Sequence, residues 1–228
     1  MHKTHIYFVP GLAANPKIFD YLTLSKDVFE LHFLEWILPD NPKESISDYA
    51  KRMCSKITHE NPILVGVSFG GVMVQEMSKH ISCKQVIIIS SIKNNQELPK
   101  RLRLAQVSKA YKLFPTHIVA NIESYEQYFF SDYLKKRAEL YKLYLSVRDA
   151  KYLHWAIYNV LHWKQKETLK DIIHIHGSND EIFPAKHIKN SILIENGTHI
   201  MILNKARIIS KIIEEKCLEI SETISIKN

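Results

Sequence analysis

The sequence predicts an α/β protein with one mostly parallel six-stranded sheet flanked by helices. Six short apolar runs recur along the 228 residues, and segments with helical patterning lie between them. Alternation of this kind is typical of βαβ units, which have parallel strands and right-handed crossovers. It breaks once, between residues 93 and 170, where no convincing strand occurs. We therefore expect a single domain over residues 1–228, with a helical insertion at about 93–170.

The first strand is expected at residues 5–9, close to the start of the chain. Residues 30–37 alternate apolar and polar side chains, which is typical of a strand nearer a sheet edge. Residues 63–67 and 86–89 are nearly continuous apolar runs, as expected of parallel strands covered on both faces. Residues 172–175 and 192–194 complete the six.

Helices are expected at residues 16–24, 46–57, 69–80 and 200–220. The last segment carries an apolar stripe at helical spacing, formed by Ile208, Ile209, Ile212, Ile213 and Leu218. The segment 93–170 is helical in composition and holds 13 of the 23 aromatic residues.

The composition, 46% hydrophobic and 24% charged, is that of an ordinary globular protein. The first residues lack the regions of a signal peptide, and no apolar run reaches the roughly 18 residues of a membrane span. The three cysteines are odd in number and lack metal-like spacing, so we expect thiols in a reducing compartment. These features predict a cytoplasmic protein with no membrane partner, and they leave its oligomeric state open.

Positive charge is concentrated in the segment 93–170, which has 15 Lys and Arg against 7 Asp and Glu. Such a segment can attract anionic ligands or nucleic acid. It can equally be a solvated, lysine-rich helical surface. No nucleic-acid-binding motif accompanies the charge, which favours the solvated surface and no nucleic-acid partner.

The pentapeptide GVSFG, residues 66–70, places Ser68 between a strand-like run and a helix-like run. A G-x-S-x-G sequence in this setting is typical of a nucleophile elbow. The tight turn needs residues without bulk on both sides of the serine, and Gly66 and Gly70 meet this need. The helix N-terminus beneath the serine also favours an oxyanion. The sequence thus predicts Ser68 as a nucleophile, the alternative being a glycine-rich turn with an incidental serine.

A serine hydroxyl needs a base, and the base needs a third group that holds its tautomer. His199 follows the strand predicted at 192–194, and Asp180 follows the strand predicted at 172–175. Both therefore lie at carboxyl ends of strands, where open α/β sheets place their sites. Glu181 is the nearest rival of Asp180, and Glu195 fits less well.

An oxyanion hole needs two N–H donors. One is expected to be the backbone N–H of Phe69, directly after the nucleophile. The other is expected in the loop after the first strand, at Leu12, with Ala13 as the alternative.

The PGL loop, the GVSFG turn, HGSND and GTH together resemble the α/β-hydrolase superfamily over nearly the whole chain. The resemblance implies an eight-stranded fold from which the first two strands are missing here. It also implies that the segment 93–170 is the helical cap of that family. Pro10 stands where the family often has a histidine before the glycine of the oxyanion loop.

Aromatic side chains of the expected cap, among them Phe130, could form an apolar acyl pocket, or they could join cap helices to one another. The pocket candidates are Tyr125, Tyr128, Phe129 and Trp155. His174 and His176 share one face of a strand, a geometry that can bind metal. They lack acidic or cysteine partners at ligand spacing, so packing is favoured and no metal is expected.

These features predict a serine hydrolase that cleaves a carboxylic ester through an acyl-enzyme. Its partner would be a small-molecule acyl substrate, and the mechanism requires no cofactor. A thioesterase or a C–C bond hydrolase would use the same three residues. A non-catalytic ligand-binding homologue is a further alternative, since fold does not fix function.

Overall fold

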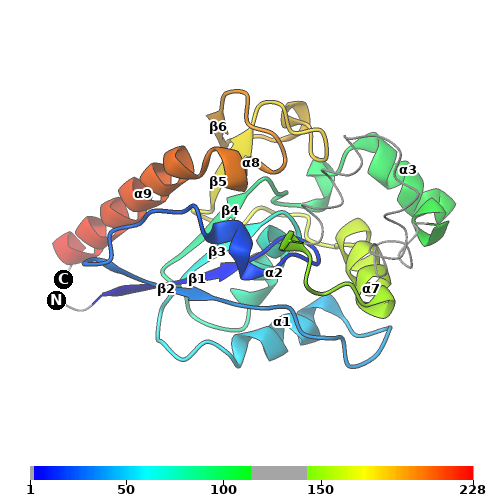
Figure 1. Cartoon of the computed structure of the whole chain (residues 1–228), viewed down its shortest axis with the longest axis horizontal. Coiled ribbons are helices and arrows are strands. Elements are labelled where there is room, and N and C mark those ends of the chain that lie inside the picture. Colours follow the sequence, from blue (N-terminus) through cyan, green and yellow to red (C-terminus); the bar gives the residue numbers. More distant parts are fainter. Residues whose placement is uncertain (1–2, 114–142, 228) are drawn as a thin grey trace.

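The computed structural model describes residues 3–113 and 143–227, with side chains up to residue 219. Its centre is a six-stranded sheet in the order β2-β1-β3-β4-β5-β6, in which every neighbouring pair is parallel (Figure 1). The strands are β1 (Thr4–Val9), β2 (Phe29–Phe33), β3 (Ile63–Val67), β4 (Gln85–Ile89), β5 (Ile173–Gly177) and β6 (Ile192–Ile194). The predicted parallel sheet is therefore confirmed, and β2 lies at its edge.

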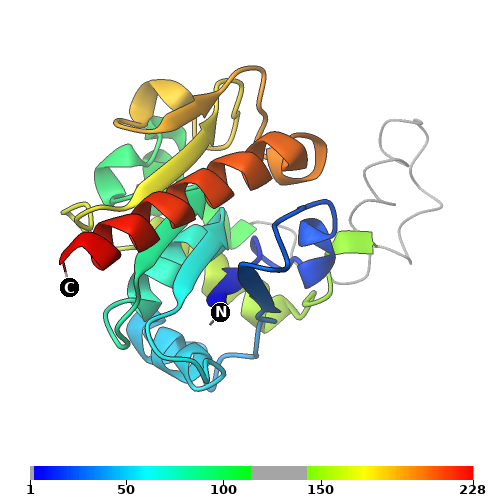
Figure 2. The ribbon, with the colours of Figure 1, turned by 90° about the vertical axis from the view of Figure 1, so that its left-hand side faces the viewer.

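Helices cover both faces of this sheet. One face packs against α1 (Ile46–Cys54), α2 (Phe69–Met77) and α7 (Ala150–Leu161). The other packs against the 3-10 helix η1 (Pro16–Phe19), α8 (Met201–Asn204) and α9 (Ala206–Lys227), and α9 crosses the sheet in Figure 2. Alternate residues of β1 divide between the two cores. Ile6 and Phe8 belong to the core on the side of η1, α8 and α9, and Tyr7 and Val9 belong to the core on the side of α1, α2 and α7.

The C-terminal helix shows which part of the predicted apolar stripe is buried. Ile209, Ile213 and Cys217 recur every four residues and are each at most 1% exposed. Ile208 and Leu218 are 47% and 45% exposed, so they lie on the solvent side. The predicted stripe was too wide at these two residues, whereas Ile212 packs partly buried against the same core.

Several predicted boundaries were wrong. The segment 16–24 forms only the short helix η1, which begins at Pro16 after the Asn15 cap. The segment 200–220 is two helices separated at Lys205. The strand predicted at 30–37 ends at Phe33. Beyond it, Trp36 enters the core and is 5% exposed.

Between β4 and β5 the described residues form no strand of the sheet. They include η2 (Asn95–Glu97), α3 (Lys100–Ser108), η3 (Ala110–Leu113) and α7. Residues 114–142 lie outside the description, so the cap boundaries at about 93–170 stay a prediction. After residue 142, the carbonyl of Tyr144 accepts a hydrogen bond from Asn15 N at 2.7 Å. This bond joins the chain before α7 to the loop after β1.

The cysteines Cys54, Cys83 and Cys217 form no disulfide within the described part of the chain. Burial raises the pKa of the Cys54 thiol to about 11 and that of Cys217 to about 12, so both resist ionisation. Among the helices described, none combines the length and the apolar character that a membrane span requires. The cytoplasmic location stays a prediction.

Candidate active site

Ser68 occupies the turn between β3 and α2 in a backbone conformation that L-residues rarely adopt. Its φ is 54° and its ψ is −118°. Hydrogen bonds fix both sides of this residue: its N–H donates to Ile89 O at 2.9 Å, and its carbonyl accepts from Ser91 Oγ at 2.7 Å. A strained conformation of this kind persists only where the surrounding structure fixes it.

Two glycines make this turn possible. A Cβ atom at Gly66 would lie 2.2 Å from the carbonyl oxygen of Gly70. A Cβ atom at Gly70 would lie 2.2 Å from the carbonyl oxygen of Val9, at the end of β1. The turn thus lies directly against the start of the loop that follows β1, which brings Ser68 and that loop together.

Ser68, His199 and Asp180 form a continuous line of hydrogen bonds. Ser68 Oγ lies 2.9 Å from His199 Nε2. His199 Nδ1 lies 2.9 Å from Asp180 Oδ2 and 3.1 Å from Oδ1. Ser68 stands at the N-cap of α2 but makes no side-chain capping bond, so its hydroxyl is directed to the imidazole.

The carboxylate of Asp180 is buried and oriented, whereas the imidazole of His199 remains partly accessible. The two side chains are 0% and 21% exposed. Asp180 Oδ1 accepts backbone hydrogen bonds from Ile182 N at 2.8 Å and from Phe183 N at 2.9 Å. These donors leave Oδ2 facing the imidazole, which favours the His199 tautomer that carries its hydrogen on Nδ1.

The loops that carry Asp180 and His199 are tied to each other by backbone hydrogen bonds. Ser178 N donates to Ile194 O at 3.0 Å, and Asn179 N donates to Gly197 O at 2.9 Å. Both loops leave carboxyl ends of parallel strands, as Ser68 does, and this explains why three distant sequence segments meet there.

The loop after β1 borders the serine from the other side. A Cβ atom at Gly11 would lie 3.7 Å from Ser68 Cβ, an ordinary contact. Ala13 N donates to the hydroxyl of Tyr152 at 3.4 Å. The backbone N–H of Leu12, next to Gly11, and that of Phe69, next to Ser68, are the donors expected from the sequence.

Comparison with known protein structures identifies the fold of the chain. No protein-family model matches the sequence, and no curated protein matches it. A thermophilic esterase from Thermogutta terrifontis superposes with a TM-score of 0.64 at 12% identity, over 95% of this chain and 90% of that one. A carboxylesterase structure from Nitrososphaera gargenis gives 0.63 at 14% identity, over 97% and 92%. The chain has the α/β-hydrolase fold. A bromoperoxidase from Bacillus anthracis shares it, with a TM-score of 0.60 at 14% identity over 97% and 92%.

Two side chains that sequence reasoning missed hold the β1 loop of this α/β-hydrolase fold. Trp36 Nε1 donates to Gly11 O at 2.8 Å, and the Tyr152 hydroxyl accepts from Ala13 N. The Trp36 ring also stacks on Phe69, with centroids 5.2 Å apart. Neither residue belongs to a motif, so only their aromatic character could have drawn attention to them.

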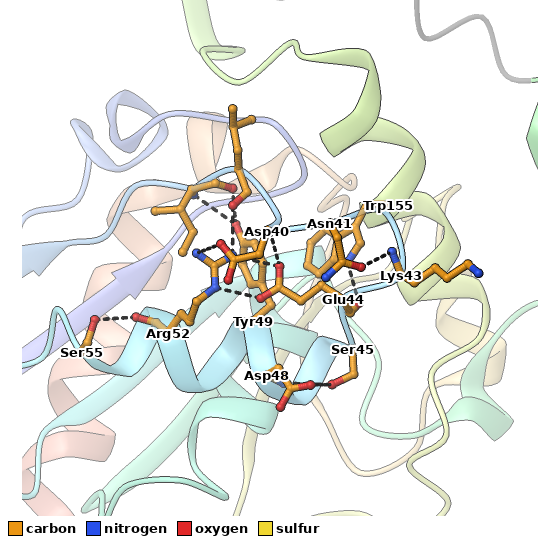
Figure 3. A network of polar contacts seen from close by, with 12 residues as sticks. Asp40, Asn41, Lys43, Glu44, Ser45, Asp48, Tyr49, Arg52, Ser55 and Trp155 are labelled. Carbon is orange, nitrogen blue, oxygen red and sulfur yellow. Dashed lines mark hydrogen bonds and ion pairs between the residues drawn. The ribbon is translucent and has the colours of Figure 1, made fainter.

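Trp155 was predicted to line a substrate pocket, but the structure places it in the core. It is 2% exposed, and its ring lies 4.2 Å from that of Tyr49. Its indole N–H donates to Glu44 O at 2.8 Å (Figure 3). A tryptophan that is buried and has its indole N–H hydrogen-bonded within the protein presents little surface to a substrate. The other predicted pocket residues, Tyr125, Tyr128 and Phe129, lie outside the described residues.

Glu44, which accepts the hydrogen bond of Trp155, is itself held by ionic contacts. Arg52 forms two hydrogen bonds with the Glu44 carboxylate, at 2.8 and 2.9 Å, and lies 3.2 Å from Asp40 (Figure 3). Because Glu44 precedes α1 and Trp155 belongs to α7, this network fixes α7 against the rest of the α/β-hydrolase fold.

His174 and His176 form a buried pair behind the Asp180 loop. His176 Nε2 donates to Phe183 O at 2.8 Å, so its Nδ1 accepts from His174 Nε2 at 3.1 Å. Burial lowers the pKa of both imidazoles. Both ring nitrogens of His176 are thus occupied within the protein, which favours packing over metal binding. The pair supports the loop that orients Asp180.

Proposed function

We propose that this protein is a serine hydrolase that cleaves a carboxylic ester through an acyl-enzyme. The supporting observation is the line of hydrogen bonds from Ser68 Oγ through the His199 ring to the Asp180 carboxylate, at 2.9 Å for each contact. A hydroxyl, an imidazole and a buried carboxylate in this order form the arrangement that activates a serine. Esterases among the structural neighbours agree with this class of reaction.

In the proposed reaction, His199 Nε2 takes the proton of Ser68 as the oxygen attacks the acyl carbon. His199 then protonates the leaving alcohol, and a water activated by the same nitrogen releases the acid. Asp180 holds the ring and stabilises the imidazolium, which gains its charge next to a fully buried carboxylate.

The oxyanion of the tetrahedral intermediate is assigned to the backbone N–H groups of Phe69 and Leu12. The N–H of Ala13 is already bonded to the Tyr152 hydroxyl, which favours Leu12 over Ala13. The start of α2 adds its positive dipole end beneath Ser68.

Turnover of p-nitrophenyl esters of graded acyl length tests the proposal. We expect hydrolysis by the native protein and a loss of more than about 10³-fold in kcat for Ser68→Ala. Ser55→Ala, at the exposed end of α1, is the matched control and should keep full activity. Parallel assays with thioesters and with substrates of C–C bond hydrolases distinguish an esterase from these two alternatives. Native protein without turnover of any of them would favour a non-catalytic binding protein.

A further inference from the structure

Three histidines from different segments meet on one face of the sheet, beside the neighbouring strands β1 and β2. His5 lies on β1, His32 on β2, and His59 in the segment after α1. His5 is paired in register with Glu30, and Tyr7 with His32. Because alternate residues of a strand share a face, these four side chains project from the same face of the sheet.

The imidazole nitrogens are close enough for one metal ion. One ligand nitrogen from each of the three histidines lies within 4.8 Å of the others. His5 Nδ1 and His32 Nε2 are 3.1 Å apart, and the rings of His5 and His59 stack with centroids 3.5 Å apart. Histidine nitrogens bind zinc at 2.0–2.1 Å, and in a tetrahedral site two such nitrogens lie about 3.4 Å apart. Two nitrogens that are 4.8 Å apart would therefore have to approach each other by roughly 1.4 Å, a movement shared between two side chains.

The carboxylate of Glu30 adds negative charge to this cluster, which suits a cation. The Glu30 carboxylate lies 3.8 Å from His5 Nδ1 through Oε2 and 3.8 Å from His32 Nε2 through Oε1. Three imidazoles and one carboxylate form a donor set that zinc accepts.

The far side of the cluster already has the partners that orient a metal-bound imidazole. The Tyr7 hydroxyl lies 2.7 Å from His59 Nδ1, and it accepts from Thr58 N at 3.2 Å. With Nδ1 bonded to Tyr7, His59 can present Nε2 to the ion. Outer partners of this kind are usual for histidine ligands.

The cluster borders solvent at His32. A hollow of about 580 Å³ is lined by this histidine together with Tyr7, Thr58 and Lys56. The side chains of His5 and His32 are 25% and 22% exposed, so their rings have room to turn. His5 lies well away from Ser68, because four steps of about 3.3 Å along β1 lead from His5 to Val9, beside the Ser68 turn.

We propose that His5, His32 and His59, with Glu30 as the fourth ligand, bind one zinc ion in tetrahedral geometry. Each neutral ring then carries its hydrogen on the nitrogen that does not face the ion. The ion joins the edge strand β2 to β1 and to the segment after α1. Its role is structural, and the proposal does not depend on the reaction at Ser68.

Equilibrium dialysis of tag-free, metal-stripped protein against Zn²⁺ and Co²⁺ tests the site. We expect one ion per chain, and the Co²⁺ form should show the intense visible bands of tetrahedral coordination. His32→Ala and His59→Gln should each weaken binding by more than about tenfold. His80→Ala, an exposed histidine bonded to Ser47 and outside the cluster, should leave binding unchanged.

Thermal unfolding supplies a second readout. With free Zn²⁺ at about 100 times the dissociation constant, we expect the Tm of native protein to rise by about 5–10 °C. Should His32→Ala fail to fold, His59→Gln decides the matter, because its side chain lies in a connecting segment. Stoichiometry well below one ion per chain would overturn the proposal, as would equal Zn²⁺ affinity in native protein and His59→Gln. The weak bands of octahedral Co²⁺ would overturn the four-ligand assignment.

Discussion

The indole N–H of Trp36 donates a hydrogen bond to the carbonyl of Gly11 over 2.8 Å, which fixes the loop that borders Ser68. Trp36→Phe removes this donor and retains an aromatic ring. We expect kcat for ester hydrolysis to fall by about tenfold with little change in KM, because a displaced Leu12 N–H stabilises the oxyanion less well.

Trp155→Phe is the matched control for this variant. It also loses one indole hydrogen bond, but that bond goes to Glu44 O and not to the β1 loop. Both variants should lose about 1–3 kcal/mol of unfolding free energy. An equal fall of kcat in both would show that the Trp36–Gly11 bond has no specific role.

The role of Asp180 is tested by Asp180→Asn. The amide is nearly isosteric but cannot hold His199 in the tautomer that accepts the Ser68 proton, so kcat should fall by about 10³–10⁴-fold. Glu181→Gln, at the neighbouring residue that the sequence left as a rival, should retain full activity. Steady-state kinetics on one p-nitrophenyl ester suffices, and loss of activity in Glu181→Gln alone would reverse the assignment.

Stability should depend strongly on Gly66. A methyl group there would meet the Gly70 carbonyl oxygen at 2.2 Å, so Gly66→Ala should lower the free energy of unfolding by more than about 2 kcal/mol. Gly11→Ala is the control, since its nearest contacts are 3.7 and 3.8 Å. Urea unfolding measures both, and similar midpoints for the two variants would contradict the packing described for the turn.

Acid should destabilise the protein through His174 and His176. Burial lowers the pKa of both imidazoles in the folded state below the usual 6.5, so the unfolded chain binds more protons in acid. The free energy of unfolding that the two neutral imidazoles contribute is complete above pH 6.5. It declines as the pH falls below that value, by up to about 1.4 kcal/mol per pH unit for each proton taken up.

Urea midpoints between pH 8 and pH 5 measure this dependence. His174→Gln keeps an N–H donor toward His176 but does not titrate. We expect it to be less stable than native protein at neutral pH and to lose less stability on acidification. A slope equal to that of native protein would assign the acid sensitivity to other groups.

Much of the fold was predictable because its signals are local. The apolar runs at residues 63–67 and 192–194 are strands with those same bounds, and the GVSFG turn connects β3 to α2. The segments bearing Asp180 and His199 follow β5 and β6 in the expected order. The carboxyl ends of parallel strands share one edge of the sheet, so the sequence could also predict that these residues would lie near Ser68.

The rest depends on contacts between residues far apart in the chain. Tyr152 lies 139 positions from Ala13 and Trp155 lies 111 from Glu44, and no local pattern marks either pair. The same is true of His5 and His59, which the loop after α1 brings together. The helix predicted at residues 16–24 is only the short 3-10 helix η1, whose Ile18 and Phe19 are buried.

Labelling with a fluorophosphonate, followed by mass spectrometry of the peptides, tests the central claim most directly. The account predicts one adduct per chain, located on Ser68, absent from Ser68→Ala and slowed strongly in His199→Gln. Native protein that hydrolyses esters but carries the adduct on another serine, or that remains unlabelled, would contradict it.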